Sequence, residues 1–195
     1  MRNNRIGTKS WKIVLSGMLA ALLVLGALPA VSLAEEAPPT TTIDGEVYYQ
    51  LDSTADLTWF AQQVNGSFYA INAIMTADIV LNTGDLSGYD GSSSNSWTQW
   101  TPISDSSNNG FTGTFDGNGH AISGVYINVN DTVKGLFAYI KEGGVVKNLG
   151  VVNSYIHYSG TLTPSSFGGI CANAYKCTIT NCYNTGTISG VGRIA

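Results

Sequence analysis

Short apolar runs separated by glycine-containing turns dominate residues 111–128, FTGTFDGNGHAISGVYIN. Apolar and small or polar side chains alternate there, and Gly, Asn or Asp interrupts every run. This pattern predicts very short strands bounded by turns. A single short strand buries little apolar surface, so copies must stack on one another to form a core. The stretch therefore restricts the chain to a fold built from stacked short strands.

Similar phrases recur downstream. Residues 122–128 align with 146–152 at a shift of 24, which matches Ile122 with Val146, and GLFAYI from Gly135 aligns with GICANA from Gly169 at a shift of 34. The second of these copies is then one residue shorter, so that residues 147–149 align with residues 180–182. Repeats of this length with turn-bounded strands predict the stacked coils of a β-solenoid, with loops such as 159–166 inserted between coils. The aligned amides Asn148 and Asn181 are expected to form an internal ladder.

The first 34 residues predict a secretory signal peptide. A basic lead precedes the apolar run 13–28, and Ser32-Leu33-Ala34 offers small residues for cleavage after Ala34. The alternative is an uncleaved membrane anchor, for which the apolar run is short. Cleavage would leave five Lys and Arg against thirteen Asp and Glu, a net charge of −8.

This acidic, charge-poor composition argues against anionic partners, which bind clusters of Lys and Arg. Nucleic acids and anionic membrane surfaces both need clustered Lys and Arg, so we expect no nucleic acid partner and no membrane partner after cleavage. Gly, Ser, Thr and Asn are abundant, as in extracellular β proteins. We therefore expect a secreted or cell-surface protein.

The segment before the repeats predicts a different set of elements. Residues 35–46 are expected to be a flexible leader, and 47–51 a first strand. Ser53 and Gly66 mark the ends of an expected helix whose apolar residues recur at helical spacing. Its apolar residues are Leu57, Phe60, Ala61 and Val64. The ranges 69–74 and 77–81 predict two strands, and 82–109 predicts a long polar loop with one ordered island at 97–103.

Three phrases carry a family resemblance: GTFDGNGHAISGVYIN, KGLFAYIKEGGVVKNLGVVNSYI and FGGICANAYKCTITNCYNTGTISG. They resemble the GLUG-type Gly-rich repeats of large bacterial surface proteins, which also occur in non-catalytic regions of IgA-specific metallopeptidases. LDSTADLTWFAQQVNG, TADIVLN and WTPI resemble the segment that leads into such repeats. The resemblance covers 47–190 and implies an all-β, right-handed parallel β-helix with residues 57–64 in an N-terminal cap.

The resemblance and the chain end suggest a longer protein. About two full repeats are present between 111 and 195, where members of the family usually carry more. The chain stops just after the Gly190 turn, and a solenoid that ends on an open coil would expose a strand edge. We therefore expect 1–195 to be the N-terminal piece of a longer protein.

Candidate catalytic residues each have a simpler structural reading. His120 beside Asp116 would suit a general acid/base pair, but Asp116-Gly-Asn-Gly119 also predicts a tight turn. The aspartates lack calcium-loop spacing, and Arg193 is the only arginine after residue 34, which leaves polysaccharide-lyase chemistry without its usual base. The sequence has no HExxH or GxSxG motif. We expect no cofactor, no metal and no catalysis, with Cys171, Cys177 and Cys182 as free thiols rather than disulfides.

Aromatic residues of the long loop are the candidate ligand-binding residues. Tyr89, Trp97 and Trp100 offer flat apolar faces on which sugar rings stack. The alternative is that Trp97 and Trp100 fold back over the first coil. The favoured function is a non-catalytic surface module for adhesion or for binding a glycan or host protein. The alternatives are a carbohydrate-active enzyme of β-helix fold and the N-terminal accessory region of a large surface metallopeptidase.

Overall fold

The computed structural model describes residues 36–91, 96–131, 133–160, 166–190 and 193–194. The predicted signal peptide with its cleavage after Ala34 lies outside these residues. The described part is mostly β, with one helix, α1 (Thr54–Asn65). Four strands accompany the helix in the N-terminal part: β1 (Thr40–Ile43), β2 (Glu46–Leu51), β3 (Asn72–Met75) and β4 (Ile79–Val80).

The remaining strands fall into three successive groups that we call layers. The first layer contains β5 (Thr114–Asp116), β6 (Ala121–Ser123), β7 (Tyr126–Val129), β8 (Val133–Lys134) and β9 (Phe137–Ile140). The second layer contains β10 (Val145–Lys147), β11 (Gly150–Val152), β12 (Tyr155–Tyr158), β13 (Ser166–Phe167) and β14 (Cys171–Ala174). The third layer contains β15 (Thr178–Thr180), β16 (Tyr183–Asn184), β17 (Thr187–Gly190) and β18 (Arg193–Ile194).

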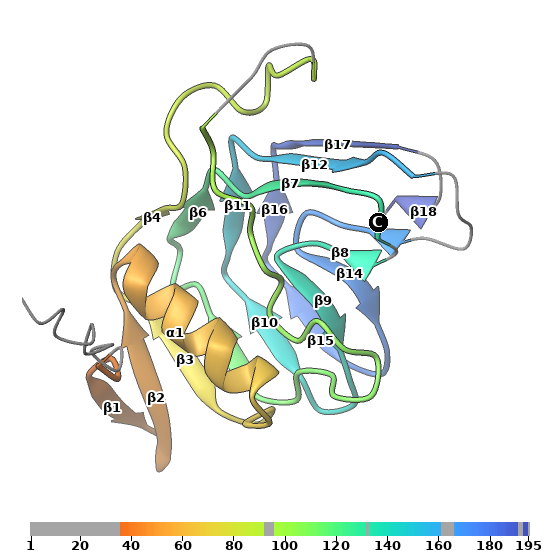
Figure 1. The fold of residues 1–195 in the computed structure, drawn as a ribbon. Helices are drawn as coiled ribbons and strands as arrows, with labels where there is room; N and C mark the ends of the chain where they lie inside the picture. The colour runs from red at the N-terminus through yellow and green to blue at the C-terminus, as the bar shows by residue number, and fades with distance from the viewer. Residues whose placement is uncertain (1–35, 92–95, 132, 161–165, 191–192, 195) are drawn as a thin grey trace, which may run out of the picture. The chain divides into compact units, whose positions relative to one another are not determined.

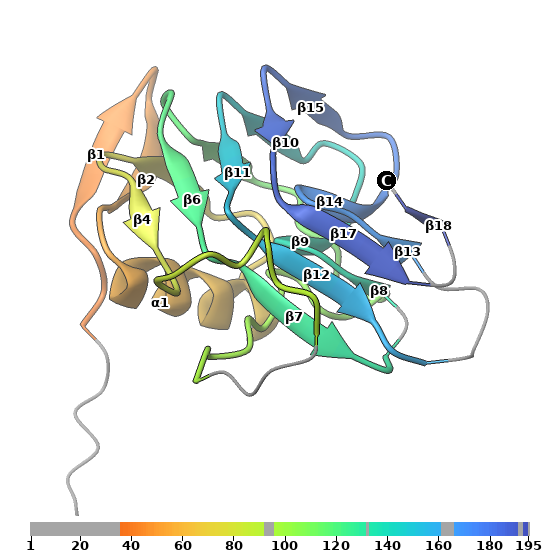
Figure 2. The same cartoon turned by 90° about the horizontal axis from the view of Figure 1, so that it is seen from above.

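Strands pair across the layers rather than within them. Each strand of the second layer pairs in parallel with its counterpart in the first layer, and β10 to β13 also pair in parallel with β15 to β18. The sheets therefore cross all layers, and β4, β6, β11 and β16 lie side by side, as do β7, β12 and β17 (Figures 1 and 2). The sheet that contains β5, β10 and β15 continues through β3 and β2 to β1.

The repeat alignment at a shift of 34 is confirmed by the strand register. Phe137 pairs with Cys171, as the alignment of GLFAYI with GICANA requires. After the dropped residue, Lys147 pairs with Thr180 as predicted. The repeat alignment therefore predicts the register of β9 with β14, between the first two layers, and of β10 with β15, between the second and third.

The predicted alignment at a shift of 24 is wrong. Ile122 pairs with Val151 at a shift of 29, and Val146 pairs with Phe115 at a shift of 31. The shift changes along the layer because four residues, 117–120, connect β5 to β6, whereas two, 148–149, connect β10 to β11. Strands of three residues with the same alternation also fit several alignments, so the apolar pattern alone could not choose the register.

The predicted helix is confirmed, together with its cap and its apolar face. The Ser53 hydroxyl accepts a hydrogen bond from the Asp56 backbone N–H at 3.2 Å and donates one to the Asp56 carboxylate at 2.7 Å. The four residues of the predicted face are buried, and Gly66 caps the C-terminus. Phe60 lies against the rings of Phe111 and Phe115, with centroids 6.0 and 5.7 Å away. The helix thus packs on the aromatic core at the start of the first layer (Figure 1).

The predicted flexible leader is wrong for its second half, because β1 lies within 35–46. β1 pairs antiparallel with β2 through a tight turn at Asp44 and Gly45, whose φ angles are 53° and 88°. Such positive φ values at Asp-Gly are typical of two-residue hairpin turns. The Asp-Gly pair next to a run of β-branched residues was the signal that the prediction overlooked.

The strands predicted at 47–51, 69–74 and 77–81 are present as β2, β3 and β4, although β3 and β4 are shorter than or offset from their predicted ranges. Among the described residues, no helix has the length and apolar character needed to cross a membrane.

Candidate functional site

The described part of the long loop at 82–109 is held against the layers by side-chain hydrogen bonds. The Asn153 amide oxygen accepts from the backbone N–H groups of Leu86 and Ser87, at 3.0 and 3.3 Å, and its amide nitrogen donates to Gly84 O at 2.7 Å. The Thr187 hydroxyl donates to Ser87 O at 2.7 Å. Within its described residues, 82–91 and 96–109, the loop has no regular strand, as predicted, apart from an isolated parallel bridge at Ile103. It is therefore anchored to both the second and the third layer.

Two of the predicted ligand-binding residues, Tyr89 and Trp97, join one aromatic cluster with Tyr126 and Tyr155. The ring of Tyr89 lies 5.1 Å from Trp97 and 4.9 Å from Tyr155, and Trp97 lies 5.5 Å from Tyr126. The Trp97 indole N–H donates to Thr83 O at 2.8 Å. Trp97 therefore folds back onto the sheet formed by β7, β12 and β17, while Tyr89 and Trp97 stay half-buried.

The third predicted residue, Trp100, lies apart from this cluster and packs against the main core. Its indole N–H donates to Leu136 O at 3.1 Å, and its backbone N–H donates to Tyr126 O at 2.8 Å. The indole is half-buried and forms one side of a groove between α1 and residues 98–101. The structure thus brings Tyr89 and Trp97 together and places Trp100 at a separate site.

The groove beside Trp100 has a volume of about 290 Å³, and none of its lining residues carries a charge. Its other lining residues are Thr54, Thr58, Ala61, Gln62, Asn65, Leu81, Asn82, Thr98, Gln99 and Thr101. Hydroxyl and amide groups next to one aromatic face can hydrogen-bond and stack on a neutral, hydroxyl-rich molecule. We call this site the Trp100 groove.

Several amides of the Trp100 groove are fixed in position by backbone groups. Asn82 accepts from Thr98 N at 2.8 Å and donates to Thr98 O at 3.0 Å. Gln99 accepts from Asn128 N at 2.9 Å and donates to Asn128 O at 2.8 Å. The wall formed by residues 98–101 is therefore organised before any ligand arrives, which lowers the entropy cost of binding.

The sequence prediction missed the α1 side of the groove. Thr54, Thr58 and Gln62 are spaced four residues apart and form a polar stripe along the helix. We interpreted α1 only through its apolar face, although a stripe of hydroxyl and amide groups is itself a signal for a polar contact surface.

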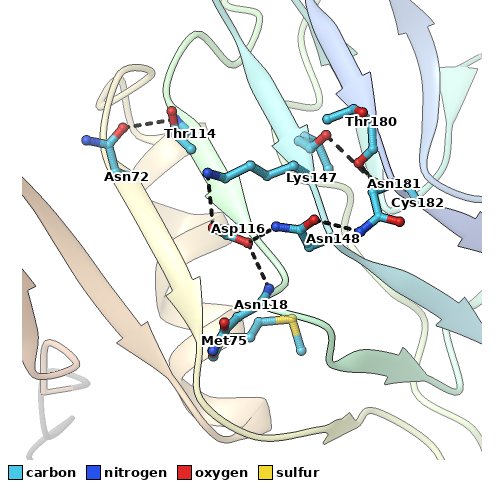
Figure 3. Close-up of polar contacts among 11 residues, drawn as sticks. Asn72, Met75, Thr114, Asp116, Asn118, Lys147, Asn148, Thr180, Asn181 and Cys182 are labelled. Carbon is cyan, nitrogen blue, oxygen red and sulfur yellow. Dashed lines mark hydrogen bonds and ion pairs between the residues drawn. The ribbon is translucent and has the colours of Figure 1, made fainter. Parts of the chain in front are cut away.

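A polar ladder crosses the layers at the turns that follow β5, β10 and β15 (Figure 3). The Asn181 amide donates to the Asn148 amide oxygen at 2.7 Å, and the Asn148 amide donates to the Asp116 carboxylate at 3.0 Å. Lys147 lies 3.2 Å from the same carboxylate. The predicted hydrogen bond between the Asn148 and Asn181 amides is confirmed, but the ladder is not internal, because Asn181 is exposed and Asn148 half-buried. Asp116 extends it into the first layer.

The predicted acid/base couple is not formed, because His120 pairs with Asp78. The His120 Nδ1 atom lies 3.2 Å from the Asp78 carboxylate, which also accepts from Ala121 N at 2.9 Å. Asp116 instead accepts from the Asn118 backbone N–H at 2.8 Å, within a turn whose residue Asn118 has φ of 52°. The interpretation of 116–119 as a tight turn is confirmed.

Burial and hydrogen bonding act in opposite directions on Asp116. Burial raises the pKa of its carboxyl group, but hydrogen bonds from Asn148 and Asn118 together with the Lys147 ammonium outweigh burial and lower the pKa below the usual value of 3.8. The folded state therefore favours the carboxylate.

This pKa shift predicts a pH-dependent stability. Because the folded pKa of Asp116 is depressed, its contribution is fully present above about pH 4 and is lost as the pH falls through the folded pKa. We expect the gap between the urea midpoints of the wild type and Asp116→Asn to narrow from pH 7 to pH 3. Asp105→Asn, at an exposed position, serves as the control. If the difference in urea midpoint between the wild type and Asp116→Asn is the same at both pH values, the depressed pKa of Asp116 is contradicted.

The cysteines are free thiols in the structure, as expected. Cys171 is buried, and burial raises the pKa of its thiol to about 12, which keeps it protonated and unreactive at neutral pH. In the described ranges, His, Cys, Asp and Glu form no group of three or more that could hold a metal ion. The side chain of Arg193 is not among the described atoms.

Comparison with known proteins gives one family match and two relatives. The model of the GLUG motif matches residues 163–189, which contain β13 to β16 and most of β17. The chain is 34% identical over 152 residues to halomucin of Haloquadratum walsbyi, a match that covers 75% of this chain and 2% of halomucin. It is 40% identical over 77 residues to a Gly-rich membrane protein of Evansella cellulosilytica, with 39% of this chain and 9% of that protein covered.

The chain thus spans only a small fraction of the curated relatives it matches. No solved structure matches it. The predicted resemblance to Gly-rich surface proteins is confirmed by the family match and by both relatives. The chain is therefore a protein of GLUG-type Gly-rich repeats, with the GLUG motif at residues 163–189.

Proposed function

We propose that this chain is a non-catalytic, surface-associated module that binds a neutral glycan in the Trp100 groove. The observation that carries the proposal is the lining of the groove, in which one indole lies among hydroxyls and amides without a charged residue. A sugar ring would stack on Trp100 while its hydroxyls exchange hydrogen bonds with groups such as Gln62 and Thr58.

The proposed location is extracellular, with secretion directed by residues 1–34. The names of the relatives, a halomucin and a Gly-rich membrane protein, support a surface-associated role. For the architecture, we propose a right-handed parallel β-helix that carries the groove at its N-terminal end. The parallel pairing of three successive layers supports this architecture.

The absence of catalysis is part of the proposal. The groove lining contains no carboxylate, imidazole, thiol or amine, and general acid/base chemistry needs such groups within hydrogen-bond reach of the substrate. A glycan bound there is held and released unchanged. Release of reducing sugar or of an unsaturated product from a bound glycan would contradict this part of the proposal.

The proposal predicts that Gln62→Ala weakens glycan binding. Loss of one or two neutral hydrogen bonds is expected to raise Kd by roughly tenfold. The secreted chain would first be screened on a glycan array, and Kd for the best neutral glycan would then be measured by calorimetry. Gln62 is exposed on α1, so its replacement should leave the fold intact.

Gln63→Ala is the matched control, because this neighbouring glutamine on α1 does not line the groove. We expect its Kd to equal that of the wild type. If the folded wild type binds no neutral glycan, the proposal is contradicted. Equal effects of Gln62→Ala and Gln63→Ala would place the binding site elsewhere.

A further inference from the structure

A second groove lies next to the Trp100 groove and shares one wall with it. Gln99, Trp100 and Thr101 line both grooves; the rest of the first is lined mainly from α1, and the rest of the second mainly from β7 and its surroundings. The second groove has a volume of about 250 Å³. Gln99 and Thr101 are exposed and Trp100 is half-buried, so residues 99–101 form a ridge between the two grooves. A molecule in the Trp100 groove is therefore placed to extend across this ridge.

The far side of the second groove combines an apolar wall with one ion pair. Pro102, Ile127 and Val129 supply the apolar wall, the last two from β7. Lys134 of β8 and Asp131 supply the ion pair, in which Lys134 Nζ lies 2.9 Å from Asp131 Oδ2. The Lys134 side chain is only 16% exposed, whereas that of Asp131 is 62% exposed. The ammonium group is thus held in place before a ligand arrives, which lowers the entropy cost of binding.

This lining is complementary to a neutral group that has a hydrogen-bond donor, an acceptor and a methyl group. An amide offers its carbonyl oxygen to the Lys134 ammonium and its N–H to the Asp131 carboxylate, both in charge-assisted hydrogen bonds. A sugar carboxylate or phosphate would be attracted by Lys134 but repelled by Asp131, so a charged sugar gains little. A plain hydroxyl can make one of these hydrogen bonds but does not cover the apolar wall.

We propose that the second groove is a subsite for the acetamido group of an N-acetylated sugar, in the same glycan chain as the sugar on Trp100. We call it the acetamido subsite. The acetamido methyl group packs on Ile127 and Val129. The inference rests on the proposed function, because the ridge joins the acetamido subsite to the Trp100 groove. It adds a chemical class to the ligand, which is a neutral glycan of two or more units with at least one N-acetylated.

Pairs of oligosaccharides that differ only in the acetamido group test the subsite. One pair is triacetylchitotriose and cellotriose, and a second is N-acetyllactosamine and lactose. We expect the acetamido member of at least one pair to bind roughly tenfold more tightly, because it gains a charge-assisted hydrogen bond and buries a methyl group. Kd for each sugar would be measured by calorimetry with the secreted chain. Equal Kd values within both pairs, or binding of none of these sugars, would overturn the inference.

Lys134→Met tests the proposed donor. Methionine keeps an apolar stem but has no N–H group, so we expect the ratio of the two Kd values within a pair to fall from about tenfold to about threefold or less. Lys176→Met is the matched control, because Lys176 also pairs with a carboxylate, that of Glu142 at 3.4 Å, but lines neither groove. It should keep the tenfold ratio. A merely structural role of Lys134 would weaken both members equally and leave the ratio unchanged, which would overturn the inference.

Gln62→Ala separates the failure of this inference from the failure of the proposed function. If Gln62→Ala weakens binding of a neutral glycan that shows no preference for an acetamido group, the acetamido subsite is overturned and the Trp100 groove stands. If the chain binds no neutral glycan, both are overturned. If Gln62→Ala and Lys134→Met each weaken binding of the same N-acetylated sugar, one glycan occupies both grooves, as the inference requires.

Discussion

Phe115→Ala is expected to lower the free energy of unfolding by about 3–5 kcal/mol, the largest loss of any single substitution considered for this chain. Phe115 is fully buried and lies in β5, between Ala73 of β3 and Val146 of β10. Its ring also lies 5.7 Å from Phe60 and 5.5 Å from Phe137. Its removal leaves a cavity between the helix and the first layer, and strands paired on both sides limit how far the surroundings can collapse.

Urea unfolding followed by circular dichroism would measure this loss. Phe68→Ala is the matched control, because Phe68 is 59% exposed and its truncation should change stability by less than about 0.5 kcal/mol. A loss below about 1 kcal/mol for Phe115→Ala would mean that α1 does not depend on this ring for its packing. If Phe115→Ala yields no secreted protein while Phe68→Ala does, that result agrees with the prediction, since one such substitution removes a large part of the stability of a domain.

The sequence correctly predicted those structural elements that depend on residues close together in the chain. The helix is such an element, because the Ser53 hydroxyl accepts from the Asp56 backbone N–H in its first turn and its apolar face follows helical spacing. The ladder of Asn148 and Asn181 is another, since both residues follow equivalent strands and both have positive φ, 54° and 53°. The mostly β character followed from the turn-bounded runs, whereas the β-helix itself stays a prediction.

The register of β5 and β6 with β10 and β11 could not be predicted from apolar alternation. The turn between β5 and β6 is two residues longer than the turn between β10 and β11, which changes the shift from 31 to 29 within one layer. A fixed shift therefore fails across the turn. Alignment of the turn residues with positive φ, Asn118 and Asn148, would have limited the choice.

The candidate site was predicted only in part, because it is assembled from distant segments. Trp100 was named from its sequence, but its groove partners Thr58 and Gln62 lie about 40 residues away on α1. Nothing in the local pattern of either segment specifies that they meet. For Trp97 the sequence left two interpretations, contact with a sugar or packing back over the first coil; its ring packs 5.5 Å from Tyr126 of β7, in the first layer.

A second large effect is expected at Gly124, where alanine should lower the free energy of unfolding by about 3 kcal/mol. Gly124 has φ of 75°, which a residue with a Cβ atom adopts only at a cost, and its added methyl group would overlap the backbone of Asn82. Asn82 cannot move away easily, because its side-chain amide donates to Gly124 O at 2.8 Å and pairs with Thr98. The close approach holds the start of the long loop against β6.

Gly119→Ala separates the two causes of this loss. Gly119 has a similar φ of 85°, but no heavy atom outside its immediate chain neighbours lies within 4 Å of an added methyl group. Alanine there should cost only about 1–2 kcal/mol for the backbone conformation. The excess loss at Gly124, measured by urea unfolding, reports the contact with Asn82.

Because Asn82 lines the Trp100 groove, Gly124→Ala should also weaken glycan binding, whereas Gly119→Ala should not. Equal losses of stability for the two variants would show that the contact with Asn82 does not limit the position of the loop.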